Sequence, residues 1–230
     1  SYNLQYRAWS RFNPLVLIRN EEFKTYLTIV IILSIMLGLS LFANSNYTFI
    51  QSFTHSFFQI ASTISSSGFC SVDFANWDYT SKGILLISML ASGCASSAGG
   101  GIKIMRWLLI LKIMKTELAK VLHPKAVFNI KIGKYSVPKD VLYQTLMFVS
   151  FYLAILATSA FLVAIREENT VVGIFGAISA VGNIGLGLDS NYDNLHCFSK
   201  IILILDMYIG RLELIPFLVL FQKDLWSFKG

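Results

Sequence analysis

Long apolar runs alternate with short charged stretches along the 230 residues of this chain. The runs 26–43 and 141–165 contain no charged residue, and the run 201–221 contains only Asp206, Arg211 and Glu213. A helix needs about 20 predominantly apolar residues to cross the hydrocarbon core of a membrane. Because several runs of this length occur, the pattern predicts a polytopic α-helical membrane protein rather than a soluble domain.

Charged residues are few in this chain, and they are unevenly distributed. They make up 14% of the sequence, whereas about 25% is usual in soluble domains. The segment 103–140 carries nine of the 19 lysines and arginines, while 44–83 and 166–200 carry three between them. Basic residues are concentrated in the cytoplasmic loops of membrane proteins. We therefore expect 103–140 and both chain termini to be cytoplasmic, and we attribute the net charge of +6 to topology rather than to nucleic-acid binding.

The sequence contains two copies of one unit. Sliding the chain by 117 positions aligns identical residues without a gap, among them Tyr26 with Tyr143, Phe58 with Phe175, Ser62 with Ser179, Gly68 with Gly185 and Gly93 with Gly210. Self-similarity at a fixed period indicates a repeated structural unit. We interpret 24–122 and 139–224 as two units in the same membrane orientation. They would be joined by a cytoplasmic linker over 123–138 and flanked by cytoplasmic segments over 1–23 and 225–230.

Each unit has the same order of parts: a full span, a shorter apolar stretch, a segment of small residues and a second span. These parts are 26–43, 50–64, 65–69 and 84–114 in the first unit, and 141–165, 171–181, 182–187 and 201–222 in the second. An apolar stretch of about a dozen residues is typical of a re-entrant element. Irregular backbone at membrane depth occurs only inside protein or beside a water-filled cavity. The sequence therefore predicts an all-α integral membrane protein of two membrane-helix–pore-helix–membrane-helix repeats.

The segments of small residues are candidates for binding a dehydrated cation. Backbone carbonyl oxygens replace the water of such an ion in selectivity filters, and glycine permits backbone angles that other residues resist. A short helix that directs its C-terminal end at the segment adds partial negative charge. Ordinary turns or helix packing would explain one such segment, but recurrence in both units favours a filter. The candidates are Ser65, Ser66, Ser67 and Gly68, and then Gly182, Asn183, Ile184 and Gly185.

Three longer motifs surround these candidates. They are STISSSGFCSVDFANWD at 62–78, SGCASSAGGGIKIMRW at 92–107 and GRLELIPFLVLFQKDLW at 210–226. Together they resemble the Trk/Ktr/HKT superfamily of potassium transporters, and most closely its Trk-type bacterial membrane subunit. That superfamily folds as four membrane-helix–pore-helix–membrane-helix repeats around one pore. The resemblance implies that this chain supplies the third and fourth repeats, which is half of the pore.

The resemblance also implies that 65–69 and 181–185 are the filter segments, with Gly68 and Gly185 as the filter glycines. Potassium would bind at Ser65, Ser66, Val181, Gly182 and Asn183, as the transported ion and without a cofactor. The second segment, VGNIGLG at 181–187, departs from the TVGYG sequence of potassium channels. Non-selective translocation of K⁺ and Na⁺ therefore stays open as an alternative.

Consecutive glycines interrupt the second span of the first unit at Gly99, Gly100 and Gly101. Each glycine costs about 1 kcal/mol against alanine in a helix, so three in a row predict a loop. The resemblance implies that this loop is an intramembrane gate below the filter. It also implies that Arg211, which aligns with Cys94, projects into the pore. The alternative is that Arg211 pairs with Asp206 or Glu213, because buried charges in membranes mark either a pathway or a pair.

We interpret the chain as part of a K⁺ transporter with a filter of backbone carbonyls, gated by the glycine loop and Arg211. A membrane enzyme and a non-conducting scaffold subunit are the competing classes. The sequence lacks a Ser–His–Asp order and an HExxH motif, so we do not expect an enzyme. Its three cysteines, which have neither metal nor disulfide spacing, are expected to be free thiols.

The resemblance further implies a location and partners. The protein would be a multi-pass protein of the bacterial inner membrane, in contact with lipid. Its full-length chain would form a homodimer and would bind a cytosolic nucleotide-binding regulatory subunit. We expect the exposed cytoplasmic surfaces for that subunit to be the basic segment 103–139 and the end of the chain at 223–230.

Overall fold

The computed structural model describes residues 20–45, 47–95, 97, 99–123, 129–133, 135–187 and 195–212. Within these ranges the fold is almost entirely helical, which confirms the predicted class, although four strands of two residues each were not predicted. Glu213, the tail 225–230 and most of the segment 1–23 lie outside the described residues.

The first unit begins with α3 (Glu21–Asn44) and α4 (Phe49–Ile64). The span predicted over 84–114 is divided into α5 (Tyr79–Leu90) and α6 (Ile104–Leu122). Between them lie β1 (Ala91–Ser92) and β2 (Ile102–Lys103), which pair in parallel. The span is therefore interrupted between Leu90 and Ile104, in the region that contains the predicted glycine loop. The chain folds back there, so that β2 lies beside β1 before α6 begins.

The second unit contains α7 (Lys139–Glu167), α8 (Thr170–Gly182) and α9 (Cys197–Arg211). At the offset of 117 positions, the start of α5 at Tyr79 corresponds to residue 196, one before the start of α9. The helix α9 continues through Met207, which corresponds to Leu90, where α5 ends. In the linker, β3 (Lys131–Ile132) and β4 (Tyr135–Ser136) form an antiparallel hairpin that was not predicted.

Polar side chains begin four of these helices. Asn20 caps α3 by accepting hydrogen bonds from the backbone of Glu22 and Phe23, and Asn169 caps α8 in the same way. Thr48 and Gln51 form a capping box at the start of α4, and Asp78 caps α5. Such caps satisfy N–H groups that have no partner within the helix. The two pore helices therefore start where the short apolar stretches begin.

Small and hydroxyl side chains hold the helices of each unit together. Ser40 of α3 bonds Ser81 of α5 with 2.9 Å between their Oγ atoms, and Thr63 of α4 bonds Ser88 of α5 at 2.9 Å. A Cβ atom added to Gly173 of α8 would lie 2.7 to 2.8 Å from backbone atoms of α7. Lipid is as apolar as leucine, so membrane helices associate through close packing and interhelical hydrogen bonds. These contacts are of that kind.

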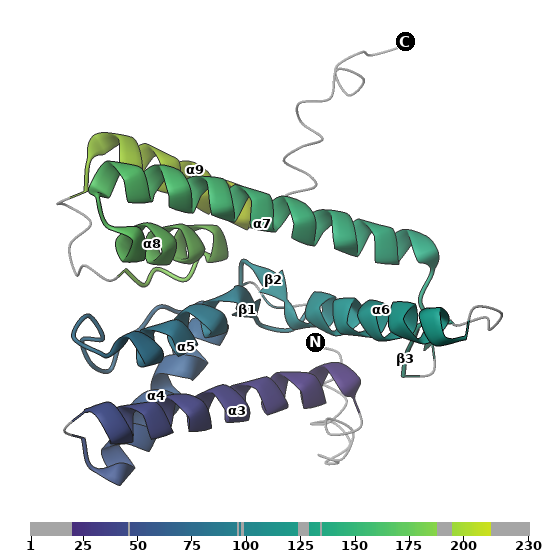
Figure 1. The fold of residues 1–230 in the computed structure, drawn as a ribbon, viewed down its shortest axis with the longest axis horizontal. Coiled ribbons are helices and arrows are strands. Elements are labelled where there is room, and N and C mark those ends of the chain that lie inside the picture. The colour runs from purple at the N-terminus through teal and green to yellow at the C-terminus, as the bar shows by residue number, and fades with distance from the viewer. Residues whose placement is uncertain are drawn as a thin grey trace.

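The two units lie side by side with their long helices roughly aligned (Figure 1). The short helix α8 packs against α7 and α9, and it also contacts α5 of the first unit. One apolar cluster crosses between the units, because Ile60, Ile64 and Leu85 pack in it with Phe175 and Ile178 of α8. The pore helix α8 thus contributes to the contact between the two units.

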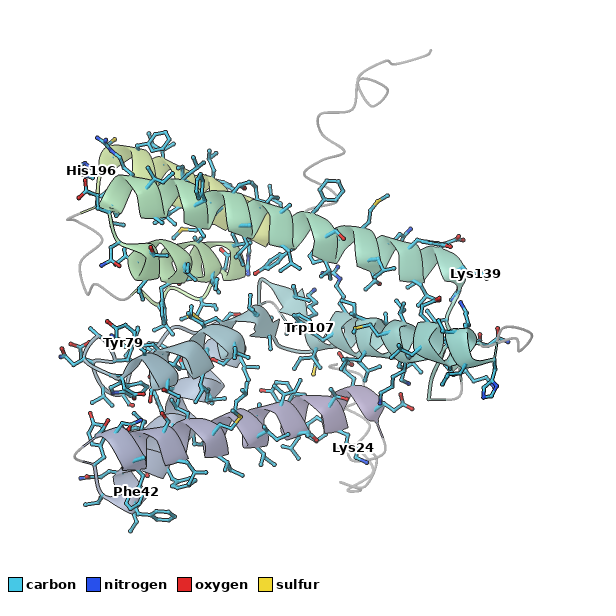
Figure 2. All side chains as sticks on the ribbon, in the orientation of Figure 1. Lys24, Phe42, Tyr79, Trp107, Lys139 and His196 are labelled. Atoms are coloured by element: carbon cyan, nitrogen blue, oxygen red, sulfur yellow. The ribbon has the colours of Figure 1, made fainter. Side chains whose placement is uncertain are left out.

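The outer faces of α3 and α7 are apolar and exposed. Within the described part of the chain, these two helices are long and apolar enough to cross a membrane. In Figure 2, Lys24 and Lys139, near the starts of α3 and α7, lie to the right of Phe42, near the end of α3, and of His196, which bonds Glu167 at the end of α7. The first spans of both units therefore run in the same direction, as the repeat predicted.

Candidate ion-binding segments and gate

The two pore helices end with the same backbone geometry. Ser66 and Asn183 have φ angles of 55° and 51°, and Gly68 and Gly185 have 72° and 86°. Each pair is separated by 117 positions, so the left-handed residues recur at the period of the repeat. Non-glycine residues rarely adopt this conformation. The structure therefore repeats an unusual turn at both predicted filter segments.

Matching hydrogen bonds stabilise both turns. In the first, the N–H of Ser67 donates to the Ser62 carbonyl at 3.1 Å; in the second, Ile184 N donates to Ser179 O at 2.9 Å. A second bond over three residues, from Ser66 N to Thr63 O and from Asn183 N to Ala180 O, completes each pattern. This combination is the Schellman motif, which ends a helix by satisfying its last carbonyl groups. It turns the chain sharply at the negative end of each helix dipole.

The two filter segments approach each other directly. A Cβ atom added to Gly68 would collide with the carbonyl oxygen of Ile184, whereas one added to Gly185 would meet no atom within 4 Å. The structure thus brings the segment 65–68 against 182–185. Gly68 is needed for this approach because any side chain would push the segments apart. Gly185 is exposed, and the reason for glycine at this position is its positive φ angle.

The proposed ligand atoms have different surroundings. The Ser65 hydroxyl lies 3.0 Å from that of Ser67, so these two side chains bond each other. A Cβ atom added to Gly210 of α9 would collide with the Val181 carbonyl, and one added to Gly100 would lie 2.7 Å from the Gly182 carbonyl. The carbonyl of Val181 therefore lies against α9, and that of Gly182 lies against the glycine loop.

The glycine loop lies at the ends of both pore helices. A Cβ atom on Gly99 would be 2.9 Å from the hydroxyl oxygens of Ser66 and Ser92, and Gly101 adopts a positive φ of 78°. At its base the loop is closed by the pairing of Ala91 with Ile102 and of Ser92 with Lys103. The predicted loop therefore packs against both filter segments, with no space for a side chain at Gly99 or Gly100.

A cavity of about 210 Å³ lies beside this loop. Gly99, Gly100, Gly101 and Arg211 all line it, so the structure brings the four predicted gate residues together. Two further basic residues, Lys103 and Arg106, face the same cavity, and the Arg106 guanidinium lies 3.6 Å from the centre of the Phe148 ring. Three basic residues thus line one cavity beside the glycine loop.

Asp206 links two helices of the second unit. The Ser159 hydroxyl of α7 donates to Asp206 Oδ1 at 2.8 Å, and Asp206 is 3% exposed. Its other oxygen has no hydrogen-bond partner among the described residues. The pairing of Arg211 with Asp206 that the sequence left open is thus absent from the described structure. The other suggested partner, Glu213, lies outside the described residues.

Two residues near the loop were missed by the sequence analysis. The carboxylate of Glu22, which is 6% exposed, accepts a hydrogen bond from the backbone of Ala95 within the loop region. Ser92 is buried, and its hydroxyl, close to Gly99, has no partner among the described residues. An acidic residue in the first turn of a helix is usual, so nothing local in the sequence marks Glu22 as a loop contact.

Comparisons with known proteins give a consistent result. The sequence model of the family described as "TrkH: Cation transport protein" matches residues 23–228. The chain is 31% identical to the Trk system potassium uptake protein TrkH of Halomonas elongata and 30% identical to that of Escherichia coli K12, in each case over 98% of this chain and 48% of the relative. The chain therefore spans about half the length of the curated relatives it matches.

A solved structure has the same fold. The crystal structure of the potassium transporter TrkH from Vibrio parahaemolyticus superimposes with a TM-score of 0.89 at 27% sequence identity. The match covers 99% of this chain and 50% of that chain. The arrangement of helices, pore helices and interrupted span described above is thus similar to half of a potassium transporter.

Proposed function

Because this chain belongs to the TrkH cation transport family, we propose that it forms half of a pore that carries K⁺ across a membrane. The observation that supports this most directly is the repeated turn at Ser66 and Asn183, with glycines two residues later. Two pore helices end there and direct partial negative charge at the same region. The other half of the pore would come from two further repeats of the full-length protein.

Within this proposal, K⁺ exchanges its hydration water for oxygen atoms of the two filter segments. The contributing residues are Ser65, Ser66, Val181, Gly182 and Asn183. The Schellman bonds already occupy the carbonyls of Ser62, Thr63, Ser179 and Ala180, which leaves later carbonyls to serve the ion. The Val181 carbonyl, which lies against Gly210, is the least accessible of the five and would contribute least.

The gate in this proposal consists of the glycine loop and Arg211. Their shared cavity supports the assignment, because an ion that leaves the filter would meet the loop first and the positive charges next. The loop would obstruct the path sterically, and Arg211 would raise the electrostatic barrier. Opening would therefore require the loop to move away from Ser66 and Gly182.

The proposal includes a membrane orientation and partners. Lys112, Lys115 and Lys120 of α6 would face the cytoplasm of a bacterium, in accordance with the charge rule. The full-length chain would form a homodimer in the inner membrane and would bind a cytosolic nucleotide-binding subunit. The hairpin and α6 offer a basic surface for that subunit.

The test is K⁺ uptake by the full-length protein. The gene is expressed in cells that lack their own K⁺ uptake systems, and growth at low K⁺ is measured together with K⁺ and Na⁺ flux into proteoliposomes. Growth and K⁺-selective flux are expected. Equal K⁺ and Na⁺ flux would support the non-selective alternative, and membrane-inserted protein without any cation flux would support a scaffold role and overturn the proposal.

A further inference from the structure

The side chain of Asn183 reaches from the end of α8 into α9. In the amide orientation that satisfies both of its polar groups, Nδ2 donates to the Met207 carbonyl at 3.3 Å and Oδ1 accepts from the Arg211 N–H at 3.1 Å. In a regular α-helix these two backbone groups bond each other, because the N–H of residue i donates to the carbonyl of residue i−4. The Asn183 amide thus forms hydrogen bonds with both members of this backbone pair in α9.

The first unit is interrupted at the corresponding place. Met207 and Arg211 align with Leu90 and Cys94, and α5 ends at Leu90. Ser66 aligns with Asn183, and its shorter side chain lies next to Gly99 of the loop rather than reaching a helix. In both units, therefore, the left-handed residue after the pore helix lies next to the second span or to the loop that interrupts it. A side chain inserted into the ladder is a recognised cause of helix distortion.

The Asn183 amide also touches the gate. In this orientation its side-chain oxygen occupies the position that lies 3.0 Å from a Cβ atom added to Gly100 and 2.7 Å from one added to Gly210. The amide is thus in contact with the glycine loop, with the backbone of Arg211 and, through its own main chain, with the second filter segment. A single side chain therefore joins the second filter segment to the backbone of Arg211.

We propose that Asn183 is a positioning residue that holds Arg211 in the gate cavity and couples the second filter segment to the gate. This inference rests on the proposed transport function. A simpler role is helix termination, because asparagine tolerates the left-handed conformation better than most residues. Asn183→Gly separates the two roles, since glycine keeps the backbone turn and removes the amide.

The experiment uses the full-length protein in proteoliposomes. Asn183→Gly is expected to raise basal K⁺ flux several-fold, as Arg211→Ala should, and to add nothing in the Arg211→Ala background, because both changes act through Arg211. Asn183→Asp keeps the acceptor for Arg211 N–H and should have a smaller effect. Asn169→Gly, which removes an asparagine cap from the other end of α8, is the control and should leave flux unchanged.

A second measurement does not depend on transport. Hydrogen–deuterium exchange of a peptide that covers 207–212 should be faster in Asn183→Gly than in wild type, and unchanged in Asn169→Gly. Unchanged exchange, or a flux increase that multiplies with that of Arg211→Ala, would overturn the coupling role. If the wild-type protein carries no K⁺, the proposed function fails, whereas the exchange result still decides whether Asn183 holds the backbone of Arg211.

Discussion

The backbone N–H of Ala95 donates a hydrogen bond of 2.6 Å to the carboxylate of Glu22, which lies 73 positions earlier in the chain. Ala95 belongs to the segment between β1 and β2, and Glu22 belongs to the first turn of α3. The glycine loop is therefore tied to a helix that does not line its cavity. The neighbouring Glu21 forms an ion pair with Lys112 of α6, so adjacent residues of α3 contact the loop and the helix that follows it.

Removal of the Glu22 carboxylate should loosen the gate. A hydrogen bond to a charged group contributes about 1.5–3 kcal/mol, so Glu22→Ala is expected to raise basal K⁺ flux and to speed the reaction of Cys94 with a thiol reagent. Glu22→Gln keeps an acceptor and should have a weaker effect. Glu21→Ala, which breaks the ion pair with Lys112 but not the loop contact, is the matched control. Equal Cys94 reactivity in Glu22→Ala and wild type would contradict the anchor.

The two filter glycines should respond differently to alanine. At Gly68 the added methyl group would collide with the Ile184 carbonyl and separate the segments, so K⁺ over Na⁺ selectivity should be lost. At Gly185 the methyl group meets open space, and only the left-handed backbone is strained, by about 1–2 kcal/mol. The measurement is K⁺ and Na⁺ flux per membrane-inserted protein. Identical losses in both variants would show that the space around Gly68 is not decisive.

Deletion of 99–101 should raise basal K⁺ flux, and Arg211→Ala should raise it by a smaller amount. At an effective dielectric constant near 20, the charge of Arg211 and a K⁺ ion about 4 Å away would repel each other by about 4 kcal/mol. If Arg211 instead belonged to a buried ion pair, its removal would cost about 3–5 kcal/mol of stability, with less protein and less flux. Normal abundance without any flux increase in either variant would exclude the gate.

Asp206 should matter for stability through Ser159. Asp206→Asn keeps an acceptor for the Ser159 hydroxyl and is expected to be tolerated. Ser159→Ala leaves the buried carboxylate without its hydrogen bond and should lower the stability by about 1–3 kcal/mol. Thermal unfolding of the purified protein in detergent is the measurement, with Thr158→Ala as the control, because Thr158 is exposed and bonds only the backbone of its own helix. A larger loss in Asp206→Asn than in Ser159→Ala would contradict this order.

The elements that the sequence predicted well are those with a strong local signal. Apolar length identified α3 and α7, and three adjacent glycines located the break between α5 and α6. The repeat identified both pore helices and the correspondence of Gly68 with Gly185. These features depend on neighbouring residues, and the repeat at an offset of 117 positions provides a second copy of the pattern for comparison.

The remaining contacts join residues that are distant in the sequence. The pairing of Ala91 with Ile102 requires the chain to fold back on itself, and no strand pattern can mark a strand of two residues. The contact between Glu22 and Ala95 and that between Asn183 and Arg211 depend on how α3 and α9 pack. Their residue types have ordinary local explanations as a first-turn acid and a helix-terminating asparagine, which is why neither contact could be predicted.

The difference between α5 and α9 has a consequence for the origin of this architecture. Both copies of the unit lie on one polypeptide, so a codon change alters one copy and leaves the other intact. In a ring of identical subunits, every subunit would acquire the loop at 99–101, and every second span would break. On a single polypeptide the two copies can differ: the helix of the first copy ends at Leu90, whereas that of the second continues to Arg211 and carries a charged side chain there.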